Sequence, residues 1–174
     1  MKKTWTILTT TLLLSALGAL YAFTTASKPV QQSPASPVHY DGNPHANGGG
    51  TTIEGGKVST FVFNAVQHDD GTVDGHLNYM FRETGVDIHM DIDCLEISGN
   101  RATLSGTVTQ VGGSGTPASY IFVGQRASFS VQDNGQGKGS APDLISDLIL
   151  YGAASCADKW PVYLPISGNI DVKP

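Results

Sequence analysis

Hydrophobic and polar residues alternate with a period of two through residues 73–111 of the chain. In the first segment, the apolar face consists of Val73, Gly75, Leu77, Tyr79 and Phe81. In the second, it consists of Val86, Ile88, Met90, Ile92 and Cys94. Successive side chains of a β-strand point to opposite faces, whereas this spacing would scatter apolar residues around a helix. We therefore predict three consecutive strands, joined by tight turns at 83–85 and 98–100.

The alternation changes phase near Cys94 and Leu95. After this point Glu96 falls on the face that was apolar before it. A slip by one residue is what a β-bulge produces, so we predict a bulge here. Gly75 and Gly106 stand inside predicted strands, which is typical of positions where a sheet bends hard or closes.

Turn motifs and apolar alternation predict further strands on both sides of this segment. They are expected at 57–67, 119–132 and 170–172, with hairpin turns at Asp69-Asp70-Gly71 and Asp133-Asn134-Gly135. Residues 144–151 are ambiguous, because their leucines and isoleucines fit a helical stripe and also alternate as a strand. The pattern leaves helix and strand open for that segment.

These elements predict one all-β domain over residues 48–174. About eight strands in mostly sequential order favour a single antiparallel meander that closes as a barrel, with a two-sheet β-sandwich as the alternative. Residues 152–167 contain Cys156, Trp160 and two prolines, and we interpret them as an inserted irregular loop.

Residues 1–26 have the pattern of a secretory signal peptide. Two lysines precede an apolar run and small residues follow it, which places cleavage after Ala26 or nearer Ala22. An uncleaved membrane anchor is the alternative, but the run is shorter than the roughly 20 residues that a span requires. Residues 27–47 are rich in proline and serine and predict a flexible tether. We expect export to the periplasm or the cell exterior, with no stable membrane insertion after cleavage.

Cys94 and Cys156 are the two cysteines of the chain. In an exported protein an even number of cysteines indicates a disulfide. This bridge would close a loop of about 60 residues and stabilise the fold by roughly 4 kcal/mol in the chain-entropy model. Two free buried thiols are the alternative.

The charge composition narrows the class of partner. The formal net charge is −5, and 14% of the residues are charged. A nucleic-acid-binding protein needs a basic face to neutralise phosphate, and an anionic membrane surface makes the same demand. We therefore predict that the partner is neither a nucleic acid nor an anionic membrane.

Three short motifs carry a resemblance to a known family. They are Gly75-His76-Leu77-Asn78-Tyr79, Ser98-Gly99-Asn100 and Asp133-Asn134-Gly135, and the similarity extends over residues 48–172. In these features the chain resembles the post-COAP domains, a family of exported bacterial domains. The resemblance implies a strand near 144–150 and brings no established catalytic residues. Residues 152–167 depart from the family pattern, so the resemblance neither supports nor contradicts the disulfide.

Asp87, His89 and Asp91 share the polar face of one predicted strand and are candidates for binding a divalent metal. Alternate residues lie about 6.7 Å apart along a strand, so an ion would need further ligands from loops. We favour a solvated polar face and predict no metal site and no cofactor.

The acidic residues include no obvious pair of catalytic carboxylates for a hydrolase. The candidates are Glu54, Glu83, Asp91 and Glu96. Glycoside hydrolysis needs two carboxylates that face each other across a cleft, and nothing in the sequence selects two of these. The chain also lacks the nucleophile elbow of serine hydrolases. We predict no catalytic residues and no enzymatic activity.

Trp160, with Tyr151 and Tyr163, could form an aromatic patch that stacks on a sugar or a partner. Packing of these rings against the sheet is the interpretation we favour. The sequence therefore predicts an exported, non-catalytic β-module that has a structural role or binds an unknown ligand or surface partner. A hydrolase with strand-face carboxylates and a divalent-metal-binding domain are the alternatives.

Overall fold

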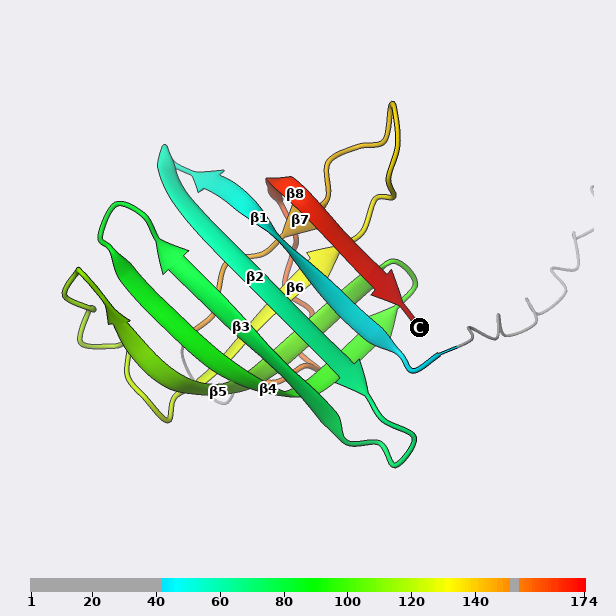
Figure 1. The fold of residues 1–174 in the computed structure, drawn as a ribbon, viewed down its shortest axis with the longest axis horizontal. Coiled ribbons are helices and arrows are strands. Elements are labelled where there is room, and N and C mark those ends of the chain that lie inside the picture. Colours follow the sequence, from blue (N-terminus) through cyan, green and yellow to red (C-terminus); the bar gives the residue numbers. More distant parts are fainter. Residues whose placement is uncertain (1–41, 151–153) are drawn as a thin grey trace, which may run out of the picture. The chain divides into compact units, whose positions relative to one another are not determined.

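The computed structural model describes residues 42–150 and 154–174. Within them the chain forms eight strands, which pair in sequential order and close as an antiparallel barrel through β1 and β8 (Figure 1). The strands are β1 (His45–Glu54), β2 (Lys57–Gln67), β3 (Val73–Phe81), β4 (Val86–Ser98), β5 (Arg101–Gly113), β6 (Arg126–Gln132), β7 (Leu144–Ile145) and β8 (Leu164–Lys173). The described part contains no helix. The predicted all-β meander barrel is confirmed, and the sandwich alternative is excluded.

The apolar face of each alternating segment points into the barrel. The largest fully buried side chains include Phe129, Leu77, Ile88, Met90, Leu104 and Ile145. Aromatic rings from three strands meet among them: Phe63 contacts Phe129 edge-on at 5.3 Å between ring centroids, and Phe61 stacks on Tyr79 at 6.2 Å. Aromatic pairs at such separations stabilise a core beyond their buried area.

The ladder between β4 and β5 is interrupted where the sequence predicts a bulge. Pairing passes from Ile92 directly to Cys94, so Asp93 is the extra residue. The shift in register returns Leu95 to the core, where it is 8% exposed. The guanidinium of Arg126 on β6 donates to both carboxylate oxygens of Asp93, at 2.5 and 2.9 Å. The predicted bulge is therefore present and is tied to β6.

Gly75 and Gly106 lie where paired strands approach closely. A Cβ at Gly75 would collide with the carbonyl oxygen of Asn64, and one at Gly106 would collide with the carbonyl oxygen of Asp91. Because each obstacle is backbone of the neighbouring strand, a residue without a Cβ fits best.

Three predicted boundaries are wrong. β1 begins at His45, within the segment predicted to be a tether up to residue 47. β6 begins at Arg126, and residues 119–125 form turns and irregular backbone. β8 starts at Leu164, inside the predicted loop 152–167, and is longer than the predicted 170–172.

Tertiary pairing explains the corrections at β1 and β8, and a local backbone turn explains the one at β6. Ala46 looks like linker in the sequence, but β1 pairs with both β2 and β8 and buries it completely. Gly124 has a φ of +90°, which interrupts the apolar alternation that predicted a strand from residue 119. Gly168 reads as a turn in the sequence, but it pairs with Gly50 in an extended strand. Each pairing partner is distant in sequence, so the local pattern does not contain it.

The seam between β6 and β8 is narrow. β7 contributes two residue pairs to each neighbour, and Ile149 adds one isolated bridge to Ser128. Asp143 reinforces the seam, because its carboxylate accepts the backbone N–H groups of Asn134 at 2.8 Å and Ile170 at 2.7 Å. For residues 144–151 the sequence left helix and strand open. The structure has a strand there, but only over the first two residues of the segment.

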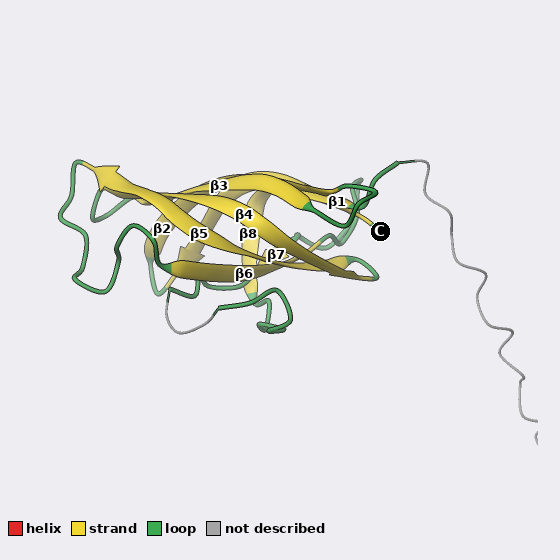
Figure 2. Ribbon diagram, turned by 90° about the horizontal axis from the view of Figure 1, so that it is seen from below, coloured by secondary structure: helices red, strands yellow, loops and turns green. Residues whose placement is uncertain are grey.

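Residues 154–163 cover the outer face of the barrel beside β6 (Figure 2). Cys156 forms a disulfide with Cys94 of β4, with the Cα atoms 5.8 Å apart, which confirms the predicted bridge. The indole N–H of Trp160 donates to the hydroxyl of Ser128 at 2.6 Å. The segment is thus attached at two points to the outside of the sheet.

In the described ranges, no helix has the length and apolar character needed to cross a membrane.

Candidate ligand-binding site at the barrel mouth

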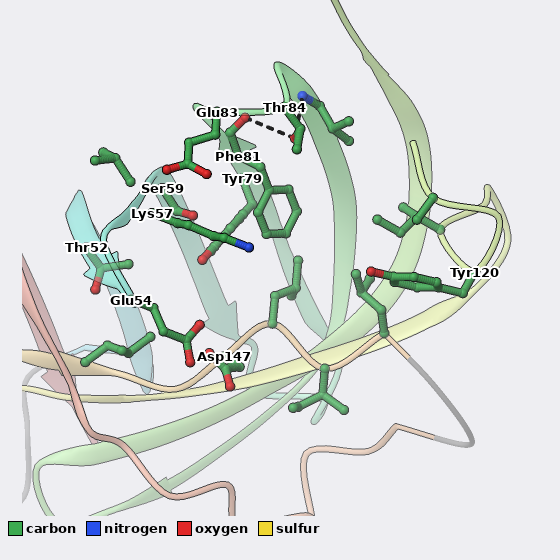
Figure 3. Close-up of a pocket in the computed structure, with 18 of the residues that line it drawn as sticks. Thr52, Glu54, Lys57, Ser59, Tyr79, Phe81, Glu83, Thr84, Tyr120 and Asp147 are labelled. Atoms are coloured by element: carbon green, nitrogen blue, oxygen red, sulfur yellow. Dashed lines mark hydrogen bonds between the residues drawn. The ribbon is translucent and has the colours of Figure 1, made fainter. Parts of the chain in front are cut away.

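A cavity of about 710 Å³ opens at one end of the barrel (Figure 3). This end is where β1 meets β2, β3 meets β4 and β5 meets β6, so the connecting turns form the rim. Known small-molecule sites are concave and have volumes of about 300 to 1,000 Å³. The cavity is therefore large enough to hold a small organic ligand.

The wall of the cavity is largely apolar. Its apolar lining consists of Val58, Tyr79, Phe81, Val86, Ala118, Ile121, Leu148, Ile149, Leu150 and Leu164. Tyr79 and Phe81 are alternate residues of β3, so both point inward, and their ring centroids lie 5.0 Å apart. Residues 147–150 supply the opposite part of the wall, because they run across the barrel end after β7.

Polar residues also line the cavity, and most of them lie at its rim. They are Thr52, Glu54, Lys57, Ser59, Glu83, Thr84, Thr116, Tyr120 and Asp147. Figure 3 shows Glu54 and Asp147 close together on one side, with Lys57 reaching over the cavity and the ring of Tyr120 on the opposite side. Among the described residues, Lys57 forms no ion pair, so its ammonium group does not neutralise a rim carboxylate directly.

Tyr163 connects the two neighbouring carboxylates. Its hydroxyl lies within hydrogen-bond distance of Asp147 Oδ2 and is 3.1 Å from Glu54 Oε1. The hydrogen bond to Asp147 is the largest cause of a raised pKa for Tyr163, because the neutral phenol can donate and the phenolate cannot. A phenol has a single proton, so it can donate fully to one of these carboxylates at a time.

Tyr79 places a second phenol in the cavity wall. The residue is 5% exposed, and burial raises the pKa of its hydroxyl. A hydrogen bond with Ser59 opposes this rise in pKa, whereas the negative charges of Asp147 and Glu54 add to it. The Tyr79 hydroxyl therefore stays neutral to a higher pH than an exposed tyrosine does.

The structure separates Tyr163 from Trp160, two of the three aromatic residues that the sequence grouped. Tyr163 lies at the rim, where it holds Glu54 and Asp147. Trp160 packs on the outer face of β6, and its carbonyl accepts a hydrogen bond from Arg101 at 3.0 Å. Trp160 therefore does not line the cavity. Tyr151 lies outside the described residues.

The three metal candidates lie on the outside of the barrel. His89 Nε2 is 3.0 Å from Asp87 Oδ2, so these two side chains meet. Asp91 is exposed and lies opposite His76 of β3. Within residues 42–150 and 154–174, no three or more His, Cys, Asp or Glu side chains are grouped so that they could hold a metal ion.

The hydrolase candidates divide between two faces. Glu54 and Glu83 line the cavity. Asp91 is an exposed residue on the outer surface, and Glu96 forms an ion pair with Lys159 of the covering segment at 3.6 Å. The sequence did not single out Asp147, the carboxylate that Tyr163 brings beside Glu54, because it lies in the segment where helix and strand could not be separated.

The chain matches no family model, no curated protein and no solved structure in comparisons with known proteins. The similarity to post-COAP domains therefore stays a prediction from the sequence motifs.

Proposed function

We propose that this protein is a non-catalytic binding module that takes a small, mainly apolar molecule into the mouth of its barrel. The cavity of about 710 Å³ with its apolar wall is the observation that carries this proposal. Burial of each CH₂ group contributes about 0.8 kcal/mol, so a chain of several methylenes would gain useful affinity there.

The protein acts in an oxidising location, outside the cytoplasm, because it contains a disulfide. The signal-peptide pattern of residues 1–26 supports export, either to the periplasm or to the cell exterior. The proline-rich segment that follows would act as a tether, and the resemblance to exported bacterial post-COAP domains agrees with this placement.

A neutral alkyl series tests the proposal. Octan-1-ol, nonan-1-ol and decan-1-ol should bind the chain without its signal peptide with affinity that rises about threefold to fourfold per CH₂. Isothermal titration calorimetry measures this series. Phe81→Ser should weaken the affinity for decan-1-ol about tenfold, because it removes the half-buried ring from the wall.

Val62→Ser is the matched control, since Val62 is an apolar residue of β2 that is 57% exposed and does not line the mouth. Its affinity for decan-1-ol should equal that of the unaltered chain. No binding by any alcohol, or an equal loss in both variants, would contradict the proposal.

A hydrolase is the second candidate, and the pairing of Glu54 with Asp147 around Tyr163 is the observation that favours it. It would use these carboxylates rather than Asp91 or Glu96, which lie outside the cavity. Turnover of glycoside or ester substrates that disappears in Glu54→Gln and Asp147→Asn, but persists in Glu96→Gln, would favour this function.

A further inference from the structure

The mouth of the barrel carries more negative than positive charge. Three carboxylates line it, from Glu54, Glu83 and Asp147, against the single ammonium group of Lys57. Glu54 ends β1, Glu83 follows β3 and Asp147 follows β7, so barrel closure is what assembles these carboxylates. A ligand that enters the cavity therefore passes a rim with a negative potential.

Hydrogen-bond donors at this rim are fewer than the acceptors. Glu54 and Asp147 share the hydroxyl of Tyr163, which has one proton for two carboxylates. No other described hydrogen bond or ion pair reaches either carboxylate. A ligand that brings positive charge or additional N–H donors would satisfy oxygens that the protein leaves to solvent.

The aromatic lining is a second and independent feature of the cavity. Tyr79 and Phe81 form part of its wall, and Tyr120 faces it from the loop before β6 (Figure 3). Aromatic faces attract ammonium groups, and the attraction strengthens where water is excluded. Tyr79 is 5% exposed, so at least one of these rings is in a desolvated setting.

We propose that the mouth is selective for an amphiphile with a cationic amine or quaternary ammonium head. This inference rests on the proposed binding function and adds the charge of the ligand. The tail lies against the apolar wall around Phe81 and Leu148, and the head lies at the rim beside Glu54 and Asp147. Lys57 disfavours the ligand head, because its ammonium group lies on the same rim and repels another cation.

Three ligands with one decyl chain and different heads test this inference. They are decyltrimethylammonium, decan-1-ol and decanoate, each titrated calorimetrically below its micelle concentration at pH of about 7. The cation should bind at least about tenfold more tightly than the alcohol, and decanoate more weakly than the alcohol. Raising the salt concentration to about 0.5 M should weaken binding of the cation and leave the affinity for the alcohol unchanged.

Substitutions at the rim test where the head of the ligand binds. Glu54→Gln and Asp147→Asn should each weaken binding of the cation about tenfold and weaken binding of decan-1-ol much less, because the alcohol head carries no charge. Lys57→Gln should strengthen the cation, which a merely structural role of the rim would not produce. Glu96→Gln is the control, because it removes an equal charge from the outer face. Since Asp147→Asn can disturb the contact with Tyr163, the Glu54 and Lys57 variants keep the test valid if it unfolds.

The outcomes separate the two levels of the proposal. Suppose that decan-1-ol binds, that Phe81→Ser weakens this binding, and that all three ligands bind with equal affinity. The proposed selectivity for a cationic head is then overturned, and the proposed binding function stands. The inference is also overturned if Lys57→Gln weakens the cation. If none of the three ligands binds, the proposed function itself fails.

Discussion

At the scale of single residues, the most informative group is the hydroxyl of Tyr163. The residue is 48% exposed and sits before a strand, so nothing in its local sequence distinguishes it from a surface tyrosine. Its contacts with Glu54 and Asp147 arise only because the connection between β7 and β8, which contains Asp147 and Tyr163, meets the end of β1 at the rim. The sequence singles out Tyr163 for a different reason, as part of an aromatic patch with Trp160 and Tyr151, whereas the structure places Trp160 on the outer face of β6.

The phenols of Tyr163 and Tyr79 predict a loss of stability at alkaline pH. Hydrogen bonding raises the folded-state pKa of Tyr163, and burial raises that of Tyr79. When a phenol has a higher pKa folded than unfolded, its contribution is complete below the unfolded value of about 10 and is lost as pH rises through the folded value. The melting temperature should therefore fall between pH of about 10 and 12.

Tyr163→Phe checks this prediction. The variant should be less stable at neutral pH, because it loses the donor, and its melting temperature should fall less steeply above pH of about 10. Tyr120→Phe, which removes a 65% exposed phenol on the loop before β6, should keep the unaltered profile. Identical pH profiles for Tyr163→Phe and the unaltered chain would show that Tyr163 does not contribute.

At the scale of elements, β7 is the weak point of the barrel. It pairs through two residues on each side, whereas β1 pairs along its whole length with β2. Asp143 compensates for this shortness. Its side chain is buried and accepts backbone N–H groups from the turn after β6 and from β8. Closure between β6 and β8 therefore depends on one carboxylate as well as on strand pairing.

Asp143→Ala should lower the free energy of unfolding by about 2 to 4 kcal/mol, because it leaves two backbone N–H groups without acceptors. Urea denaturation followed by circular dichroism measures the change. Asp74→Ala is the control, since the Asp74 side chain is 85% exposed, and it should shift stability by less than about 0.5 kcal/mol. Equal effects of the two substitutions would argue against a closing role for Asp143.

At the scale of the whole molecule, the disulfide joins the barrel to the segment that covers it. It links β4 to residues 154–163 across 62 positions of the chain. In the chain-entropy model, closing such a loop contributes about 4 kcal/mol. Trp160 and Lys159 add contacts with the same outer surface, but neither is covalent.

The double substitution Cys94→Ala and Cys156→Ala should lower the free energy of unfolding by about 2 to 4 kcal/mol. Decan-1-ol should still bind once the variant is folded, because the bridge lies outside the cavity lining. Urea titration measures the stability. An intact mass that increases by about two units on reduction verifies the bridge in the unaltered chain. Unchanged stability in the double variant would contradict the stabilising role.

The sequence by itself determined the strands that repeat apolar residues at every second position, their meander order and the bulge before Leu95. It also predicted the disulfide between its two cysteines, which the structure confirms. These features follow from local periodicity, from short hairpin turns and from the count of cysteines, all of which can be read along one segment at a time.

Only the tertiary structure decided where β1 and β8 begin, and which acidic side chains meet. Ala46 and Gly168 became strand residues because distant strands pair with them. Glu54 and Asp147 became neighbours because the chain after β7 crosses the barrel end and Tyr163 holds both. Alternation with a period of two predicts which face of the sheet a side chain occupies. It does not predict which other connections lie at the same rim after the barrel closes.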